Sequence, residues 1–201
     1  MSDPIRDDSH ITVGAFYYPW YGRDPWIHWR DGDPNTGHHT PPKNWAANYL
    51  PQIFFPNNTS IAENLYDNKN PETIRRQMEL MIDCGIQFGI SSWWGQKDNN
   101  GKPTFEDTTF DNIINQVHPT LPAKFQKFKW CILYEDEGFE TIPVNQLVND
   151  LSYIKQKYAS SPYYLHVDGK PVIFVYNAEH KTSPPPNPPP PNDPLDDLNR
   201  W

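Results

Sequence analysis

Apolar and aromatic residues gather in four short runs, and the segments between them have the spacing of helices. The runs are residues 12–18, 86–94, 128–134 and 172–176. Because they are short and apolar at most positions, they are typical of strands buried on both faces, as in a parallel sheet. Residues 163–167 precede an Asp168-Gly169 turn, which predicts a short hairpin whose second arm is the fourth strand.

Three segments between the runs are predicted to be helices. The clearest begins after Asn70, a residue suited to an N-cap, has Pro71 in its first position and stops at Gly85. Its apolar residues fall on one face, namely Ile74, Met78, Met81 and Ile82. Further helices are predicted over about 105–118 and from Pro143 onward.

Strands that alternate with helices predict a parallel sheet with right-handed crossovers. No G-x-G-x-x-G or P-loop pattern follows any of the runs, which disfavours the nucleotide-binding versions of this arrangement. A (β/α)8 barrel remains, and a complete one needs about 250 residues. We therefore expect an α/β fold, a partial (β/α)8 TIM-type barrel of about four βα units, over residues 11–181.

Half a barrel leaves two open parallel edges. Three explanations stay open: the 201 residues are a truncated form of a longer protein, the proline-rich end comes from a mispredicted or frame-shifted gene, or the chain self-associates through the open sheet edges. We favour the first two. Three segments fall outside the predicted βα pattern. Residues 1–10 are expected to be an N-terminal extension, and residues 19–69 a long loop of the kind that often carries function. Residues 182–201 hold eight prolines and are expected to be an extended, disordered tail.

Charge and hydropathy narrow the choice of partners. The chain has 17 Lys and Arg residues against 25 Asp and Glu residues, a net charge of −8, which disfavours nucleic acid as a partner. No apolar run is long enough to span a membrane, and residues 1–10 lack the apolar centre of a signal peptide, so a cytoplasmic location is the default expectation. Cys84 and Cys131 are too few for a disulfide framework and are expected to be buried thiols.

Active sites of (β/α)8 barrels lie at the carboxyl ends of the strands, so the residues that follow the four runs are the candidates for chemistry. Aromatic residues and one carboxylate dominate there, and the long loop adds a histidine and a tryptophan. The candidates are Tyr18, Tyr21, His28, Trp29, Trp93, Trp94, Glu135 and Tyr176. Sugar rings pack their C–H faces on aromatic rings, and their hydroxyls bond to carboxylates and imidazoles. This set therefore indicates a carbohydrate partner.

Several of these residues have a plain structural reading as well. Tyr17 and Tyr18 alternate across the sheet, so one faces the barrel centre and the other the helices. Tyr18 is closer to the mouth of the barrel, and we expect it to contact the sugar unless it packs in the core. One of Trp93 and Trp94 is expected to line the cleft and the other to pack in the core, while Glu135 could simply cap a loop. His38-His39 has no further cluster with the spacing of metal ligands, so we expect no metal and no cofactor.

Several segments together resemble one family. They are GAFYYPWYG (14–22), WIHW (26–29), the loop and helix before residue 86, GISSWWG (89–95), FKWCILYEDEGF (from 128) and YYLHVDGKPVIFVYN (to 177). This set is similar to glycoside hydrolase family 99, the endo-α-mannosidases and endo-α-mannanases. The resemblance implies a metal-free retaining endo-glycosidase in which the 2-hydroxyl of the sugar is the internal nucleophile. Glu135 matches a substrate-contacting carboxylate of that family.

The resemblance also places the two catalytic glutamates of the family in a late E-x-x-E-like motif, which residues 178–201 do not match. We therefore expect a glycoside hydrolase-like protein that acts on α-mannoside-type glycans, in a truncated form without those carboxylates. Two alternatives stay open. One is a non-catalytic carbohydrate-binding remnant, and the other is an adaptor whose proline-rich tail binds an aromatic groove of the SH3 or WW type.

Overall fold

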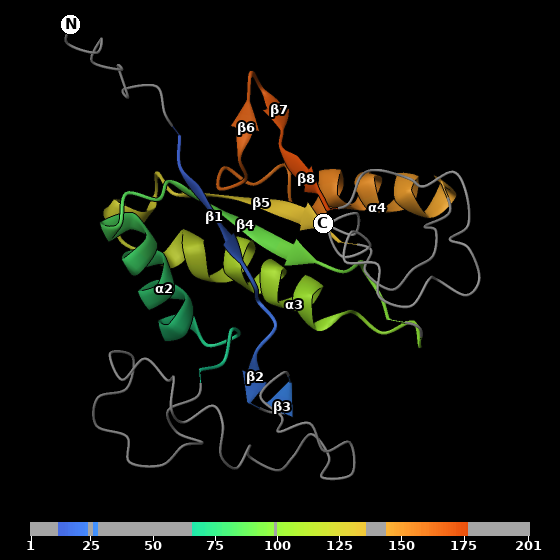
Figure 1. Ribbon diagram of the computed structural model, residues 1–201, viewed down its shortest axis with the longest axis horizontal. Helices are drawn as coiled ribbons and strands as arrows, with labels where there is room; N and C mark the ends of the chain where they lie inside the picture. Colours follow the sequence, from blue (N-terminus) through green and yellow to red (C-terminus); the bar gives the residue numbers. More distant parts are fainter. Residues whose placement is uncertain (1–11, 24–25, 28–65, 99, 136–143, 177–201) are drawn as a thin grey trace, which may run out of the picture.

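Four parallel strands form the centre of the protein. The computed structural model describes residues 12–23, 26–27, 66–98, 100–135 and 144–176 (Figure 1). The sheet has the order β1-β4-β5-β8, and each neighbouring pair is parallel. The strands are β1 (Gly14–Tyr17), β4 (Phe88–Trp93), β5 (Lys129–Tyr134) and β8 (Ile173–Val175). All four lie within the predicted apolar runs, and their spatial order follows the sequence, as in one half of a barrel.

Helices connect the strands of this sheet. α2 (Pro71–Asp83) begins as predicted, because the Asn70 side chain accepts hydrogen bonds from the backbone N–H groups of Glu72 and Thr73. α3 (Phe105–Asp111) continues into a π-helix, η3 (Asn112–Val117), and two 3-10 turns, η4 (His118–Thr120) and η5 (Ala123–Phe125). The third helix, α4 (Val144–Lys157), precedes β8. The single helix predicted over 105–118 is therefore only partly α-helical.

All three helices pack on the same face of the sheet. The Tyr17 hydroxyl donates to Gln77 Oε1 of α2 at 2.6 Å. Trp93 Nε1 donates to Asp107 Oδ1 of α3 at 2.9 Å, and the Tyr134 hydroxyl donates to Asp150 Oδ2 of α4 at 2.9 Å. On this face the ring of Trp130 packs directly against the backbone of the neighbouring strand β4 at Gly89. A Cβ at Gly89 would lie 2.3 Å from the Trp130 ring, so a glycine is required at this position.

A buried carboxylate joins the layers. Asp107 of α3 accepts hydrogen bonds from Trp93 on β4, from the Tyr153 hydroxyl of α4 at 2.7 Å and from the Tyr158 hydroxyl at 2.6 Å. Lys157 Nζ lies 3.3 Å from the same carboxylate. Because each oxygen has a partner, the cost of burying this charge is offset. One side chain thereby holds a strand and two helices in register.

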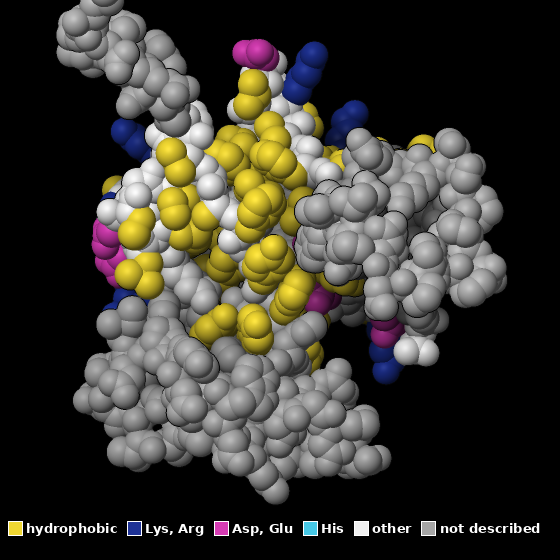
Figure 2. Space-filling view, viewed as in Figure 1, with side chains coloured by type: hydrophobic (Ala, Val, Ile, Leu, Met, Phe, Trp, Pro, Cys, Tyr) yellow, Lys and Arg dark blue, Asp and Glu magenta, His cyan; other side chains and the backbone are white. Residues whose placement is uncertain are grey.

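The opposite face of the sheet has none of these helix contacts. Neighbours in the parallel register put Phe16, Ile90, Leu133 and Phe174 on this second face. Figure 2 shows hydrophobic side chains gathered across it. We call it the inner face, because in a closed barrel this side of the strands points to the centre.

Several expectations need correction. The hairpin pairs β6 (His166–Val167) with β7 (Lys170–Pro171), so its second arm precedes β8 instead of being part of it. The segment 19–69 contains a small antiparallel pair, β2 (Gly22–Arg23) with β3 (Trp26–Ile27). Cys84 is exposed, since it caps the end of α2, whereas Cys131 is buried.

Some of the predictions lie outside the described residues. They are the extension 1–10, the tail 182–201 and most of the long loop. Among the described helices, none has the length and apolar character needed to cross a bilayer.

Candidate functional site

Three aromatic side chains meet where β1 and β4 end. The rings of Tyr18 and Trp20 are 4.7 Å apart, and those of Trp20 and Trp94 are 6.1 Å apart. Both indoles are held by one hydroxyl, because Trp20 Nε1 donates to Ser92 Oγ at 2.9 Å and Trp94 Nε1 donates to it at 3.1 Å. Ser92 is fully buried, so the orientation of the two tryptophans is set from beneath.

Glu135 follows β5 directly and lies beside two other predicted site residues, Trp94 and Tyr176. Its backbone N–H donates to the Trp93 carbonyl at 3.1 Å, and the Tyr176 N–H donates to the Tyr134 carbonyl at 2.9 Å. The parallel ladder therefore continues one residue past the strands, which places Trp94, Glu135 and Tyr176 side by side on three neighbouring strands. By alternation they belong to the inner face. Glu135 is only 6% exposed.

The two tryptophans of β4 have different surroundings. Trp93 is fully buried on the helix side, where its ring stacks near Tyr153 at 6.3 Å and its N–H bonds to Asp107. Trp94 is partly exposed and bonds to Ser92, two residues earlier on the inner face. The structure thus leaves Trp94 at the strand end and puts Trp93 in the core, out of reach of a sugar ring in this arrangement.

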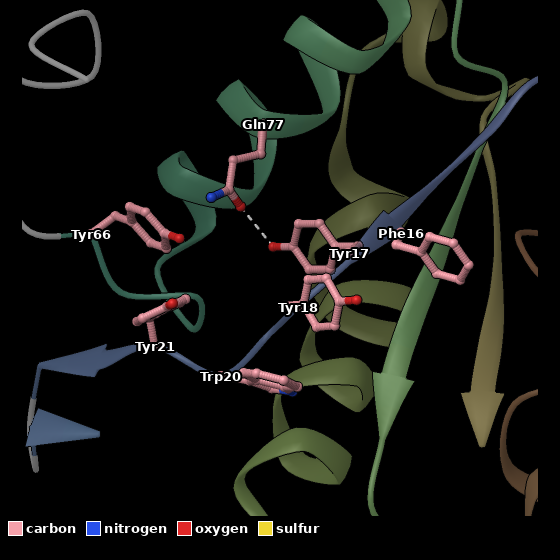
Figure 3. A pocket seen from close by; sticks show the side chains of 7 residues that line it. All are labelled: Phe16, Tyr17, Tyr18, Trp20, Tyr21, Tyr66 and Gln77. Atoms are coloured by element: carbon pink, nitrogen blue, oxygen red, sulfur yellow. Dashed lines mark hydrogen bonds between the residues drawn. The ribbon is translucent and has the colours of Figure 1, made fainter. Parts of the chain in front are cut away.

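Tyr21 lies apart from this row, in a pocket beside the outer edge of β1 (Figure 3). The pocket has a volume of about 350 Å³ and is lined by Phe16, Tyr17, Tyr18, Trp20, Tyr21, Tyr66 and Gln77. Tyr21 and Tyr66 pack edge to face with centroids 5.5 Å apart. Tyr18 and Trp20 line both this pocket and the aromatic cluster, so the two features adjoin.

A buried amide organises the wall of the pocket. The Asn68 side chain accepts from the Tyr21 backbone N–H at 2.9 Å and donates to the Tyr17 hydroxyl at 3.0 Å. That hydroxyl in turn donates to Gln77. Burial raises the pKa values of the Tyr17 and Tyr66 hydroxyls, so both stay protonated and keep a proton to donate.

The structure therefore brings four of the eight candidates to one side of one sheet end. They are Tyr18, Trp94, Glu135 and Tyr176, with Tyr21 in the adjoining pocket and Trp93 in the core. His28 and Trp29 lie outside the described residues. Sequence reasoning did not select Trp20, Ser92, Asn68 or Tyr66. Trp20 could have been selected from its position just after the first strand. Tyr66 and Asn68 gave no such indication, because they lie some 45 residues from Tyr21 along the chain.

The side chains at this end of the sheet suit a ligand with a hydroxyl-rich ring. Of the four residues that directly follow the sheet strands, Glu135 is the carboxylate and the other three are aromatic. A carboxylate accepts hydrogen bonds from sugar hydroxyls, and the rings beside it offer flat apolar faces. Within the described ranges, no cluster of three or more His, Cys, Asp or Glu residues is arranged to hold a metal ion.

Comparison with known proteins points the same way. The sequence model of glycosyl hydrolase family 99 matches residues 8–185. Two solved structures of endo-alpha-mannosidase from Bacteroides thetaiotaomicron, one of them with bis-tris-propane, are similar in fold, each with a TM-score of 0.56. Sequence identity to them is 21% and 20%, over 82% and 83% of this chain. The chain spans 41% and 45% of their lengths, and no curated protein matches it.

Proposed function

Because the chain belongs to glycosyl hydrolase family 99, we propose that the row Trp94, Glu135 and Tyr176, with Tyr18 and Trp20 beside it, binds α-mannoside-type glycans. The observation that carries this proposal is the placement of Glu135. It is a largely buried carboxylate between two aromatic residues, at the end of a parallel sheet where barrel enzymes act.

Each part of the row has a distinct role in such binding. Trp94 and Trp20 stack against the C–H faces of sugar rings, and Ser92 keeps their indoles in place. Glu135 accepts hydrogen bonds from hydroxyls of the same sugar, which selects a ring that presents its hydroxyls toward the carboxylate. Tyr18 and Trp20 extend the surface toward the Tyr21 pocket, so a glycan longer than one sugar can follow it.

One carboxylate, Glu135, is enough to bind a sugar but not to cleave a glycosidic bond. Glycosidases place two carboxyl groups astride the scissile bond. Among the residues that directly follow the four strands of the parallel sheet, only Glu135 is acidic. We therefore propose that the 201-residue chain binds an α-mannoside without cleaving it, and that hydrolysis needs a second carboxylate that the described residues do not place here.

The test is a calorimetric titration of the 201-residue chain with α-linked mannotriose. The β-linked glucose trimer cellotriose is the control sugar. Glu135→Gln should weaken mannotriose binding by about 10- to 100-fold, the loss expected when a charged hydrogen bond is removed. Asp168→Asn is the matched control, since it removes a carboxylate from the β6–β7 turn at the other end of β8 and should leave the affinity unchanged.

Equal binding of both sugars, or equal binding by Glu135→Gln and the wild type, would remove this row from the site. Release of reducing ends from mannotriose by the wild-type chain would contradict the separation of binding from cleavage.

A further inference from the structure

We propose that Asp150 of α4 is a positioning residue for the glycan site, because it holds the ends of β4 and β5 from the helix side of the sheet. This inference rests on the proposed function and deepens it. The row Trp94, Glu135 and Tyr176 supplies the sugar contacts, and Asp150 keeps these three side chains aligned. Asp150 is buried beneath α4 and acts on the sugar only through them.

Two hydrogen bonds join Asp150 to the two strand ends. Its Oδ1 accepts from Gln96 Nε2 at 2.7 Å, and its Oδ2 accepts from the Tyr134 hydroxyl at 2.9 Å. Tyr134 is the last residue of β5, and Gln96 lies just beyond Trp93, the last residue of β4. Each oxygen of one carboxylate therefore holds a different strand end, and the distance between the two ends is set from α4.

Every member of the row lies next to one of these two anchors, Tyr134 and Gln96. Glu135 directly follows Tyr134, and the Tyr176 N–H donates to the Tyr134 carbonyl at 2.9 Å. Trp94 is separated from Gln96 by a single residue. Because only these short backbone links lie between anchor and row, a shift of either anchor moves the side chains that contact the sugar.

The turn after Trp94 is held at a second point as well. Thr104 Oγ1 donates to the Gly95 carbonyl at 2.7 Å, and the Thr104 N–H donates to the Gln96 carbonyl at 3.2 Å. Thr104 is also the N-cap residue of α3. Since Asp150 supplies the bond to the Gln96 side chain, this turn is tied to α3 through its backbone and to α4 through its side chain.

An apolar residue would be expected at position 150 if packing alone decided it. Asp150 and Ile154 are one turn apart and are the two buried residues of α4. Burying a carboxylate there costs free energy that an apolar side chain would not. Asp107 has Lys157 as a cationic partner, whereas the ion pairs among the described residues do not include Asp150. A residue that breaks the packing pattern in this way is expected where function requires it.

Amide hydrogen exchange of the 201-residue chain tests the positioning without any sugar. The Glu135 N–H bonds to the Trp93 carbonyl at 3.1 Å, so its exchange rate reports on the end of the β4–β5 ladder. Asp150→Ala should raise this rate by about tenfold. The Trp130 N–H is the internal reference, because it bonds to the Tyr163 carbonyl at the opposite end of β5, and its rate should change far less.

Two further variants separate positioning from a general loss of stability. Asp150→Asn keeps both bonds, because its carbonyl accepts from Gln96 and its amide group donates to the Tyr134 hydroxyl. This variant should restore the wild-type exchange rates. Ile154→Val is the matched control, since it removes a buried methyl group one turn later on α4. It should lower the stability of the whole chain but leave the ratio of the two exchange rates unchanged.

Calorimetric titration with α-linked mannotriose measures the effect on the glycan site. Asp150→Ala should weaken binding by about tenfold, because displaced side chains make poorer contacts with the sugar. Asp150→Asn and Ile154→Val should both bind as the wild type does. Tyr134→Phe removes one of the two bonds, and it replaces Asp150→Ala in both measurements if that variant does not fold. Combined with Asp150→Ala, it should weaken binding no further, because both substitutions remove the same bond.

If the Glu135 rate in Asp150→Ala rises only in step with the Trp130 rate, Asp150 stabilises the chain as a whole and the inference is overturned. A failure of Asp150→Asn to restore the rates would overturn it too, and so would unchanged mannotriose affinity in Asp150→Ala. A wild type that binds no mannotriose would instead contradict the proposed function. The exchange rates would then still decide whether Asp150 holds the row in place.

Discussion

Ser92 shows how one small side chain decides the placement of larger ones. It is buried on the inner face and accepts hydrogen bonds from both Trp20 and Trp94, so two indoles that sequence alone leaves unrelated share one anchor. Alternation along β4 predicted that Trp93 and Trp94 point to opposite faces. It did not say which face is which, because that depends on the side where α3 packs. Asp107 bonds Trp93 and thereby leaves Trp94 at the sheet end.

His118 predicts a dependence of stability on pH. It is buried against the Tyr163 ring, and burial lowers the pKa of its imidazole from 6.5 to about 4. Between these values the unfolded chain binds a proton that the folded chain excludes, so stability is full above pH 6.5 and is lost as the pH falls toward 4. The contribution should be about 2–3 kcal/mol.

Urea unfolding at several pH values measures this contribution. His118→Gln keeps an amide donor for the Phe125 carbonyl, which His118 Nε2 contacts at 2.9 Å, but it cannot titrate. The wild type should therefore lose more stability than His118→Gln between pH 6.5 and pH 4, while the carboxylates titrate in both. Parallel profiles for the two proteins would contradict this reading of His118.

Sequence patterns predicted the positions of helices and strands better than any other feature of the structure. Asn70, Pro71 and Gly85 set the limits of α2, because caps and stops act through neighbouring backbone groups. The four strands lie within the predicted apolar runs for a similar reason, since burial on both faces leaves a continuous apolar pattern. The hairpin was misplaced by a few residues, because β7 and β8 are adjacent in the sequence and only their partners distinguish them.

Asp107 is the residue on which the contact between these elements depends most. Asp107→Ala leaves the buried Trp93 donor without its acceptor and removes the carboxylate partner of Lys157. It also leaves the Tyr158 hydroxyl with only the Asp107 backbone carbonyl, at 3.2 Å. Leaving such groups unpaired should lower the free energy of unfolding by about 3 kcal/mol, measured in urea. Asp111→Ala is the control, since Asp111 is a more exposed partner of Lys157 at 3.7 Å, and its loss should cost under about 1 kcal/mol. Equal losses in both variants would contradict the central role of Asp107.

The whole molecule has the architecture that the sequence predicted, a partial barrel of glycosyl hydrolase family 99. The chain covers 41% and 45% of the solved structures that it resembles. This agrees with the four parallel strands in sequential order, which are half of a barrel. At this scale β1 and β8 are the two edges of the described sheet, because each pairs with a single described neighbour.

The sequence by itself determined the strands, most helix limits, the family and the kinds of residue at the strand ends, because these depend on local pattern and short-range capping. Only the tertiary structure decided which side chains meet. Tyr66 and Asn68 join Tyr21 across some 45 residues, and Trp94, Glu135 and Tyr176 align through the register of three strands. Such contacts depend on how elements pack in space, and no local pattern encodes that distance.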